Sequence, residues 1–322
     1  EYRFTTLSER FSGEAHLVEA IDFAASCIKA PLFTPETLQE AKTNLKAALL
    51  RIMDKPSSYA LISALRLGGE GEPLANFSQG TPELIDGITL EDLKAFHLQM
   101  ISEETVYVIG IGQFSSKHHE RLIHHFPQRQ TAPSPVSPIR IKPIRTMEST
   151  KAVKQTALVR LYATSKTNAD ADYAPVRVMT YLLGQLPNAL LFTEIREKRN
   201  LCYSIYSSLL HFDGAMMVST GISADQINTV VELIEQQITR IAEKDYPEEL
   251  LKSAKALLIS NYTGLKDDVL SWMNVEFSAW LNEKPFDLEK ICAQIDAVTV
   301  TEVAQAARRL VAVSQAVVKG EA

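Results

Sequence analysis

The chain's main candidates for chemistry are an arginine and a tyrosine seven residues apart, Arg196 and Tyr203. A guanidinium and a phenol both donate hydrogen bonds, so the pair could hold a carbonyl oxygen or an oxyanion. The sequence between them predicts a helix end and then a strand, because Asn200 can adopt the left-handed conformation that terminates a helix. Taken alone, the residues favour a structural role, with Arg196 on the last helix carbonyls and Tyr203 half-buried.

Two other patterns have residues that could do chemistry, but we expect a structural role for each of them. The His-rich stretch 118–125 places Glu120 and His124 four residues apart on a predicted helix, where two such groups would bind a metal only weakly. We expect this stretch to be a solvated helix face. Cys202 has no basic activator nearby in sequence, so we expect it to pack in the core rather than act as a nucleophile.

Composition limits the classes of function. The 322 residues are 46% hydrophobic, enough for one large or two ordinary domains with real cores. No apolar run approaches the roughly 18 residues of a membrane span. A net charge of −6 and a pI near 5.7 argue against nucleic-acid or anionic-membrane partners. The three cysteines, Cys27, Cys202 and Cys292, show no disulfide or metal spacing, which favours a reducing, cytoplasmic compartment.

A proline-rich stretch divides the chain. Five of the fourteen prolines lie between Pro127 and Pro143. Proline stiffens and extends a chain and cannot continue a helix, so this composition is typical of a linker. We therefore predict a first domain over residues 1–126, a linker over 127–145 and a second domain over 146–322.

The two predicted domains contain an internal repeat at an offset of 210 residues. Residues 88–110 and 298–320 share their apolar positions, and each predicts a capped helix followed by a buried strand. Residues 17–28 and 227–238 carry apolar residues at the same helical positions on one face. The repeat predicts two copies of one α+β unit.

The copies differ in what precedes the helix at 17–28 or 227–238. The second copy has five predicted elements there: a strand at 155–164, a helix at 173–184, the helix with Arg196, and strands at 203–210 and 216–223. The first copy has sixteen residues there, so roughly 60 to 70 residues are missing by comparison. We expect the first domain to be N-terminally truncated. The alternative is that this domain is naturally shorter.

The stretch Phe192–Tyr203 resembles the arginine and tyrosine motif in the C-terminal half of the insulinase/pitrilysin family of zinc metallopeptidases, which includes proteins like the mitochondrial processing peptidase. Residues 88–112 and 155–320 resemble the family's first-domain ending and its second domain. The resemblance implies an α+β fold of two homologous domains, each a mostly antiparallel sheet covered by helices, of the LuxS/metallopeptidase-like class. In active members a His-x-x-Glu-His helix binds zinc, and that helix would lie in the missing segment.

The resemblance also implies where a third zinc ligand should be. In the family a glutamate lies six residues before an Asp-x-Pro turn, with a supporting glutamate seven residues earlier. This chain keeps the turn at 54–56, and counting back gives Ala48 at the ligand position and Ala41 at the supporting one. A methyl group cannot coordinate a metal. We therefore expect no metal site, no catalytic residue and no cofactor in this chain.

These observations imply a zinc-less subunit, most like those of bacterial heterodimeric members. Arg196 and Tyr203 would bind peptide substrate beside the zinc of a homologous partner subunit. The alternative assembly is a homodimer, in which the partner is a second copy of this chain. One alternative is an active zinc peptidase with His-x-x-Glu-His upstream, which Ala48 argues against. The other is a structural or chaperone-like homologue, similar to respiratory-complex core subunits. Retention of both Arg196 and Tyr203 argues against that alternative.

Overall fold

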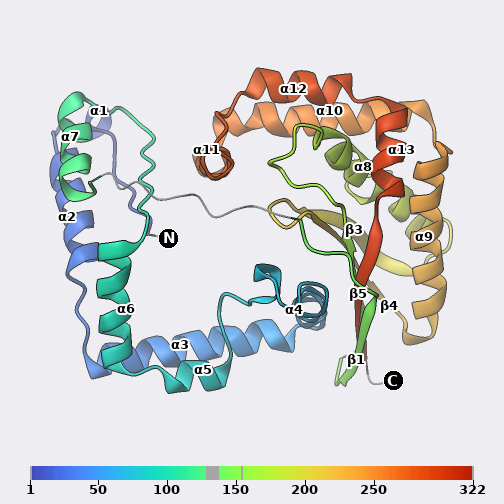
Figure 1. Cartoon of the computed structure of the whole chain (residues 1–322), viewed down its shortest axis with the longest axis horizontal. Coiled ribbons are helices and arrows are strands. Elements are labelled where there is room, and N and C mark those ends of the chain that lie inside the picture. The colour runs from blue at the N-terminus through green and yellow to red at the C-terminus, as the bar shows by residue number, and fades with distance from the viewer. Residues whose placement is uncertain (1, 128–137, 154, 321–322) are drawn as a thin grey trace. The chain divides into compact units, whose positions relative to one another are not determined.

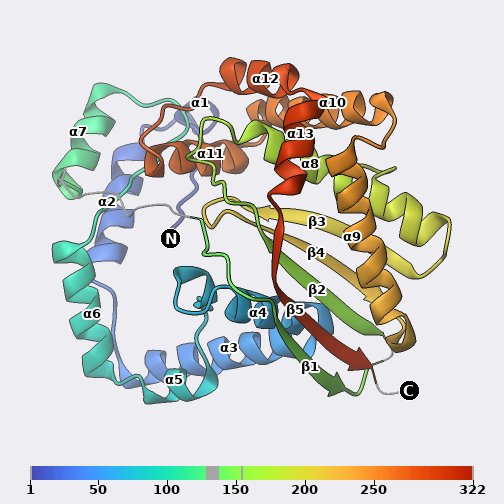
Figure 2. The same cartoon turned by 45° about the vertical axis from the view of Figure 1, so that its right-hand side comes forward.

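The computed structural model describes residues 2–127, 138–153 and 155–320. The chain forms two compact units, which Figures 1 and 2 show from two directions. The first holds Glu1–Ala48, Thr81–Ser134 and Val269–Leu281. The second holds Leu49–Gly80, Pro135–Asp268 and Asn282–Ala322. Helices and one sheet are both present, which confirms the predicted α+β class.

The second unit is built on a five-stranded sheet in the order β1-β5-β2-β4-β3. Only β1 and β5 run parallel, and the other neighbours pair antiparallel, as expected for a mostly antiparallel sheet. The strands predicted in this half are confirmed. β1 was not predicted, because its sequence is mostly polar and directly follows the proline-rich stretch. The strands are β1 (Arg145–Lys151), β2 (Thr156–Ala163), β3 (Cys202–Leu210), β4 (Ala215–Ile222) and β5 (Val311–Gly320).

Helices cover one face of this sheet (Figure 2). Apolar residues at helical spacing create the contact; in α9, Val230, Ile234 and Ile241 are completely buried against the main core. A 3-10 turn, η3 (Ala224–Gln226), leads into α9, and a second, η4 (Leu265–Asp267), follows α10. The helices on this face are α8 (Ala174–Gly184), α9 (Ile227–Glu243), α10 (Glu248–Gly264), α12 (Leu288–Ala297) and α13 (Val300–Arg308).

The helix α4 (Pro56–Gly68) packs on the other face against β2 and β5. Ala60 and Ala64 are fully buried there, and the Ser314 hydroxyl donates a hydrogen bond to the Ala64 carbonyl at 2.6 Å. The 3-10 turn η1 (Pro73–Ala75) follows in the same unit. Residues 49–80 thus pack with the second unit, whereas the predicted boundaries placed them in the first domain. Most of the predicted linker, 127–145, lies outside the described residues.

The described part of the first unit contains helices and no strand. The strand predicted at 106–110 is therefore wrong for this structure. Val106, Tyr107 and Val108 are 37 to 47% exposed, whereas their counterparts in β5 are fully buried between two strands. A strand needs neighbours for its backbone groups, and the described residues of this unit supply none. The helices are α1 (Glu9–Ser12), α2 (Leu17–Lys29), α3 (Pro35–Asp54, ending in the second unit), α5 (Pro82–Gly87), α6 (Leu90–Glu103), α7 (Ser116–His125) and α11 (Val269–Leu281).

The helices of the internal repeat form in both halves, and one pair, α6 and α13, begins with the same cap. In α6 the Thr89 hydroxyl accepts the Asp92 amide, and the Asp92 carboxylate accepts the Thr89 amide. Thr299 and Glu302 form the same reciprocal pair at the start of α13. The helix α4 comes from the first half of the chain and belongs to the second unit. The helix α11 begins 213 residues later, in the second half of the chain, and belongs to the first unit.

Candidate functional site

Arg196 lies on a short π-helical turn, η2 (Phe192–Glu197). The Lys198 amide donates to the Thr193 carbonyl at 3.0 Å, five residues back, which widens the turn. Asn200 has a φ of 53° and ends the turn in the left-handed conformation, as predicted. No hydrogen bond joins the Arg196 side chain to any residue that the structure describes. The predicted alternative, in which Arg196 caps the helix carbonyls, is therefore wrong.

Buried apolar residues fix the orientation of this turn. Leu191 and Ile195 have no exposed surface and pack into the main core of the second unit, on the single face that their spacing predicted. Because this face is buried, the adjacent Arg196 side chain is left half-exposed at the surface of the unit. The core thus determines where the guanidinium lies.

A bulge at the start of β3 turns Tyr203 outward. Cys202 pairs with Ile222 and Ile205 pairs with Thr220, so Tyr203 and Ser204 together face a single residue of β4. Such a bulge changes the direction of a side chain. The Tyr203 side chain is consequently 78% exposed, and the alternative prediction of a half-buried strand aromatic is wrong.

Arg196 and Tyr203 come together as a stacked pair, with a third member that sequence analysis missed. The Arg196 Cζ lies 5.2 Å from the centroid of the Tyr203 ring and 4.6 Å from that of Phe192. Both distances are typical of cation–π contacts. Phe192 lies four residues before Arg196 on a helical turn, and this spacing was the signal that could have identified it.

Two acidic residues lie close to Arg196 in sequence, Glu194 and Glu197, and neither forms an ion pair with it among the described residues. Glu194 accepts hydrogen bonds from Lys198, at 2.9 Å, and from Arg199. These bonds, chiefly the one from Lys198, hold the pKa of Glu194 below its usual value. Arg196 makes no ion pair with any described residue, so its charge remains available to a ligand.

The strand that carries Tyr203 is held by a close approach of α8. The Ser207 hydroxyl donates to the Thr180 carbonyl at 2.9 Å, and the Gln185 side-chain Nε2 donates to the Ser207 carbonyl at 2.9 Å. Gly184 lies between these contacts, and a Cβ added there would come within 2.6 Å of the Ser207 backbone nitrogen. Only glycine allows the helix to pack this closely on β3.

Cys202 packs in the core as predicted. It is buried next to the site, and burial raises the pKa of its thiol. A protonated, buried thiol is a poor nucleophile. Cys202 therefore supports the start of β3 and is not a candidate for covalent chemistry.

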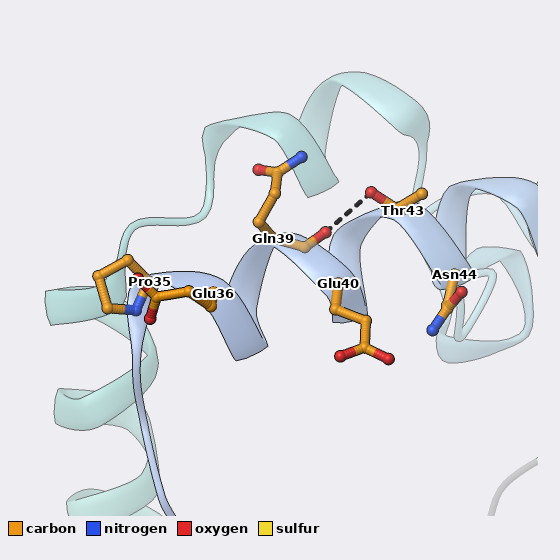
Figure 3. Close-up of a pocket in the computed structure, with 6 residues that line it drawn as sticks. All are labelled: Pro35, Glu36, Gln39, Glu40, Thr43 and Asn44. Atoms are coloured by element: carbon orange, nitrogen blue, oxygen red, sulfur yellow. Dashed lines mark hydrogen bonds between the residues drawn. The ribbon is translucent and has the colours of Figure 1, made fainter.

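The positions expected to match a zinc site do not fit a metal ion. Ala48 is half-buried and Ala41 is exposed, both on α3. Among the described residues, no three His, Cys, Asp or Glu side chains come close enough to hold a metal. A hollow on the same helix is lined from one side only, and Thr43 there bonds its own helix at the Gln39 carbonyl (Figure 3). Its lining residues are Pro35, Glu36, Gln39, Glu40, Thr43 and Asn44.

The His-rich stretch is a solvated face only in part. Glu120 and His124 are exposed, as predicted, but the stretch also docks α7 on α2. The Arg121 Nε lies 2.5 Å and the His125 Nε2 2.7 Å from one oxygen of Asp22. Hydrogen bonds from Arg121 and then from His125 lower the pKa of Asp22 to about 2.

The Asp22 contacts predict a pH dependence. Because the folded-state pKa lies below the usual 3.8, the stabilisation is complete above pH 3.8 and is lost as the pH falls toward 2. We expect Asp22→Asn to lower the Tm at pH 5 and to narrow the difference in Tm between pH 5 and pH 3. Thermal melts of Glu120→Gln, an exposed residue on α7, provide the control. An unchanged difference in Asp22→Asn would contradict this account.

None of the helices in the described segments combines the length and apolar character needed to cross a membrane.

Comparisons with known proteins identify related chains. A family model described as the Peptidase M16 inactive domain matches residues 87–258, more than half of the chain. The Bacillus subtilis (strain 168) protein named "Probable inactive metalloprotease YmfF" is 22% identical over 288 residues, covering 88% of this chain and 67% of that protein. The Helicobacter pylori (strain ATCC 700392 / 26695) protein named "Non-peptidase homolog YmxG" is 26% identical over 302 residues, with the same coverage. The chain thus spans about two thirds of the length of these relatives.

A solved structure of a conserved protein from Enterococcus faecalis V583 is similar in fold. The TM-score is 0.86 at 24% sequence identity, and the match covers 98% of this chain and 77% of that chain. Because the match extends over nearly all of the chain, the arrangement of helices and sheet described above is shared with a known structure.

Proposed function

Because the chain belongs to the M16 peptidase family and matches its inactive domain, we propose that it is a non-catalytic subunit that lends Arg196 and Tyr203 to a partner's peptide hydrolysis. The partner in this proposal is a homologous subunit, or a second copy of the chain, and the hydrolytic zinc belongs to the partner. The names of two relatives, an inactive metalloprotease and a non-peptidase homologue, support the non-catalytic part of the proposal.

The observation that carries the proposal is the stacked pair of Arg196, which is half-exposed, and Tyr203, which is exposed. The phenol is open to solvent, and the guanidinium has no carboxylate partner among the described residues. Neither side chain contributes much to the stability of the fold in this arrangement, since exposed polar contacts contribute at most about 1 kcal/mol. Held ready for an oxygen acceptor, each donor could stabilise a developing oxyanion by about 3 kcal/mol.

The absence of ligand side chains at Ala48 and Ala41 supports placing the zinc elsewhere. A peptidase zinc needs three protein ligands and an open position for water. The proposal assigns those ligands to the partner, while this chain contributes hydrogen-bond donors and a positive charge to the bound peptide. This division of roles is consistent with a chain that has Arg196 and Tyr203 but has alanine at both expected ligand positions.

The test is to isolate the protein from the cells that make it, through an affinity tag on the chromosomal copy, and to measure metal and activity. We expect a complex with a second homologous subunit, about one zinc in that subunit, and cleavage of an internally quenched peptide. The chain produced alone should bind no stoichiometric zinc and cleave nothing. About one chelator-removable zinc in the isolated chain, with activity, would instead support the active peptidase; a zinc-free complex without activity would support the structural homologue.

A further inference from the structure

We propose that Phe192 is a positioning residue that holds the Arg196 guanidinium in place for substrate. This inference rests on the proposed function, in which Arg196 contacts the peptide. The Phe192 ring is the nearer of the two rings around the guanidinium, with its centroid 4.6 Å from the Arg196 Cζ. It is also the better anchored ring.

The two rings differ in how firmly they are held. Phe192 is half-buried and packs against the main core of the second unit, whereas the Tyr203 ring is mostly exposed. Phe192 and Arg196 also share the turn that Ile195 anchors in the core. Phe192 therefore connects the guanidinium to the rigid part of the fold, and Tyr203 remains free to meet a ligand.

An aromatic contact suits an arginine that must bind an incoming oxygen. A ring attracts the flat face of the guanidinium and leaves the in-plane N–H groups unused. A carboxylate in the same place would take those donors and cancel the charge. Phenylalanine, which has no hydrogen-bonding group of its own, holds Arg196 without competing for its donors. Of the two acids beside Arg196 in sequence, Glu194 is paired with Lys198 and Arg199, and Glu197 forms no ion pair with a described residue.

The first experiment observes the contact directly in the full chain by NMR. The signals of the Arg196 Hε and δ protons are assigned by their loss in Arg196→Lys. Ring currents should shift them upfield of the free-arginine positions in the wild type, and Phe192→Leu, which keeps apolar bulk but removes the ring, should reverse most of the shift. Phe192→Tyr should keep it. Phe212→Leu, at an exposed phenylalanine in the β3–β4 turn, is the matched control and should also keep it.

The second experiment measures kcat/KM of the tagged complex on an internally quenched peptide. Phe192→Leu should lower kcat/KM about three- to tenfold, the range expected for one cation–π contact. Phe192→Tyr should restore most of the loss. In an Arg196→Lys background the Phe192→Leu change should have little further effect, because both changes remove the same interaction. Phe212→Leu should match the wild type.

The two experiments separate failure of this inference from failure of the proposed function. If Phe192→Leu leaves the Arg196 proton shifts in place, or lowers kcat/KM no more than Phe212→Leu, Phe192 does not position the guanidinium, and the inference is overturned. If Arg196→Lys leaves kcat/KM unchanged, the proposed function fails, and the NMR shifts still decide whether Phe192 holds Arg196. Equal losses for Phe192→Leu in both backgrounds would also overturn the inference.

Discussion

Replacing Arg196 by lysine or Tyr203 by phenylalanine should lower the kcat of the assembled peptidase complex about a hundredfold while leaving its Tm nearly unchanged. Lysine keeps the charge but loses the planar set of donors, and phenylalanine loses only a hydroxyl. If either donor stabilises the oxyanion that forms during peptide hydrolysis, its loss costs about 3 kcal/mol in the transition state. The two groups contribute far less than this to the stability of the folded protein.

The structure explains why stability should not change. The Tyr203 side chain is 78% exposed, and Arg196 forms no ion pair with a described residue, so each change should cost under about 1 kcal/mol of unfolding free energy. Tyr206→Phe is the matched control, because Tyr206 is another exposed tyrosine of β3, three residues farther along. Normal turnover in assembled Arg196→Lys and Tyr203→Phe complexes would return both residues to a structural role. An equal loss of kcat in Tyr206→Phe would show that the effect comes from a general disturbance of β3 and not from loss of a donor in the Arg196–Tyr203 pair.

Gly184→Ala should destabilise the second unit by about 1 to 3 kcal/mol. The added methyl group would lie 2.6 Å from the Ser207 backbone nitrogen and 2.8 Å from its hydroxyl oxygen. The nitrogen cannot move without disturbing the strand, and the hydroxyl cannot move without losing its hydrogen bond to the Thr180 carbonyl. The expected result is a lower urea midpoint with an unchanged m-value. Since β3 carries Tyr203, kcat/KM should fall as well at temperatures where the variant is folded.

Gly264→Ala is the matched control for this substitution. Gly264 ends α10 as Gly184 ends α8, and apart from its chain neighbours and its own helix backbone no described atom lies within 4 Å of the Cβ that alanine would add. Alanine favours helix by up to about 1 kcal/mol over glycine, so this variant should be as stable as the wild type or slightly more so. Equal midpoints for the two variants would contradict the close packing of α8 on β3.

Periodicity in the sequence predicted most of the second unit correctly. The strands around 155–164, 203–210 and 216–223 and the helix at 227–238 form there, because their apolar patterns match a sheet covered by helices within the same unit. Asn200 also ends the turn before Tyr203 as predicted, since its left-handed conformation depends on local sequence.

What sequence could not predict depends on distant neighbours. Residues 106–110 have the apolar pattern of a strand, but their pairing depends on other strands, which the described part of that unit lacks. The burial of α4 on the sheet depends on contacts with β2 and β5, far away in sequence. The bulge that exposes Tyr203 arises from the register against β4, which local pattern does not encode.

The most direct test of the central claim is to ask whether a bound peptide touches position 203. A photoreactive p-azidophenylalanine replaces Tyr203 in the tagged complex, an isotope-labelled peptide substrate is added, and cross-links are mapped by mass spectrometry after irradiation. The ring at this position is exposed, so the replacement should not disturb the fold. Phe212, in the turn that follows the far end of β3, carries the same probe as the control. Our account predicts cross-links to peptide from position 203 and none from position 212. Peptide that cross-links at neither position in an active complex, or only at position 212, would contradict it.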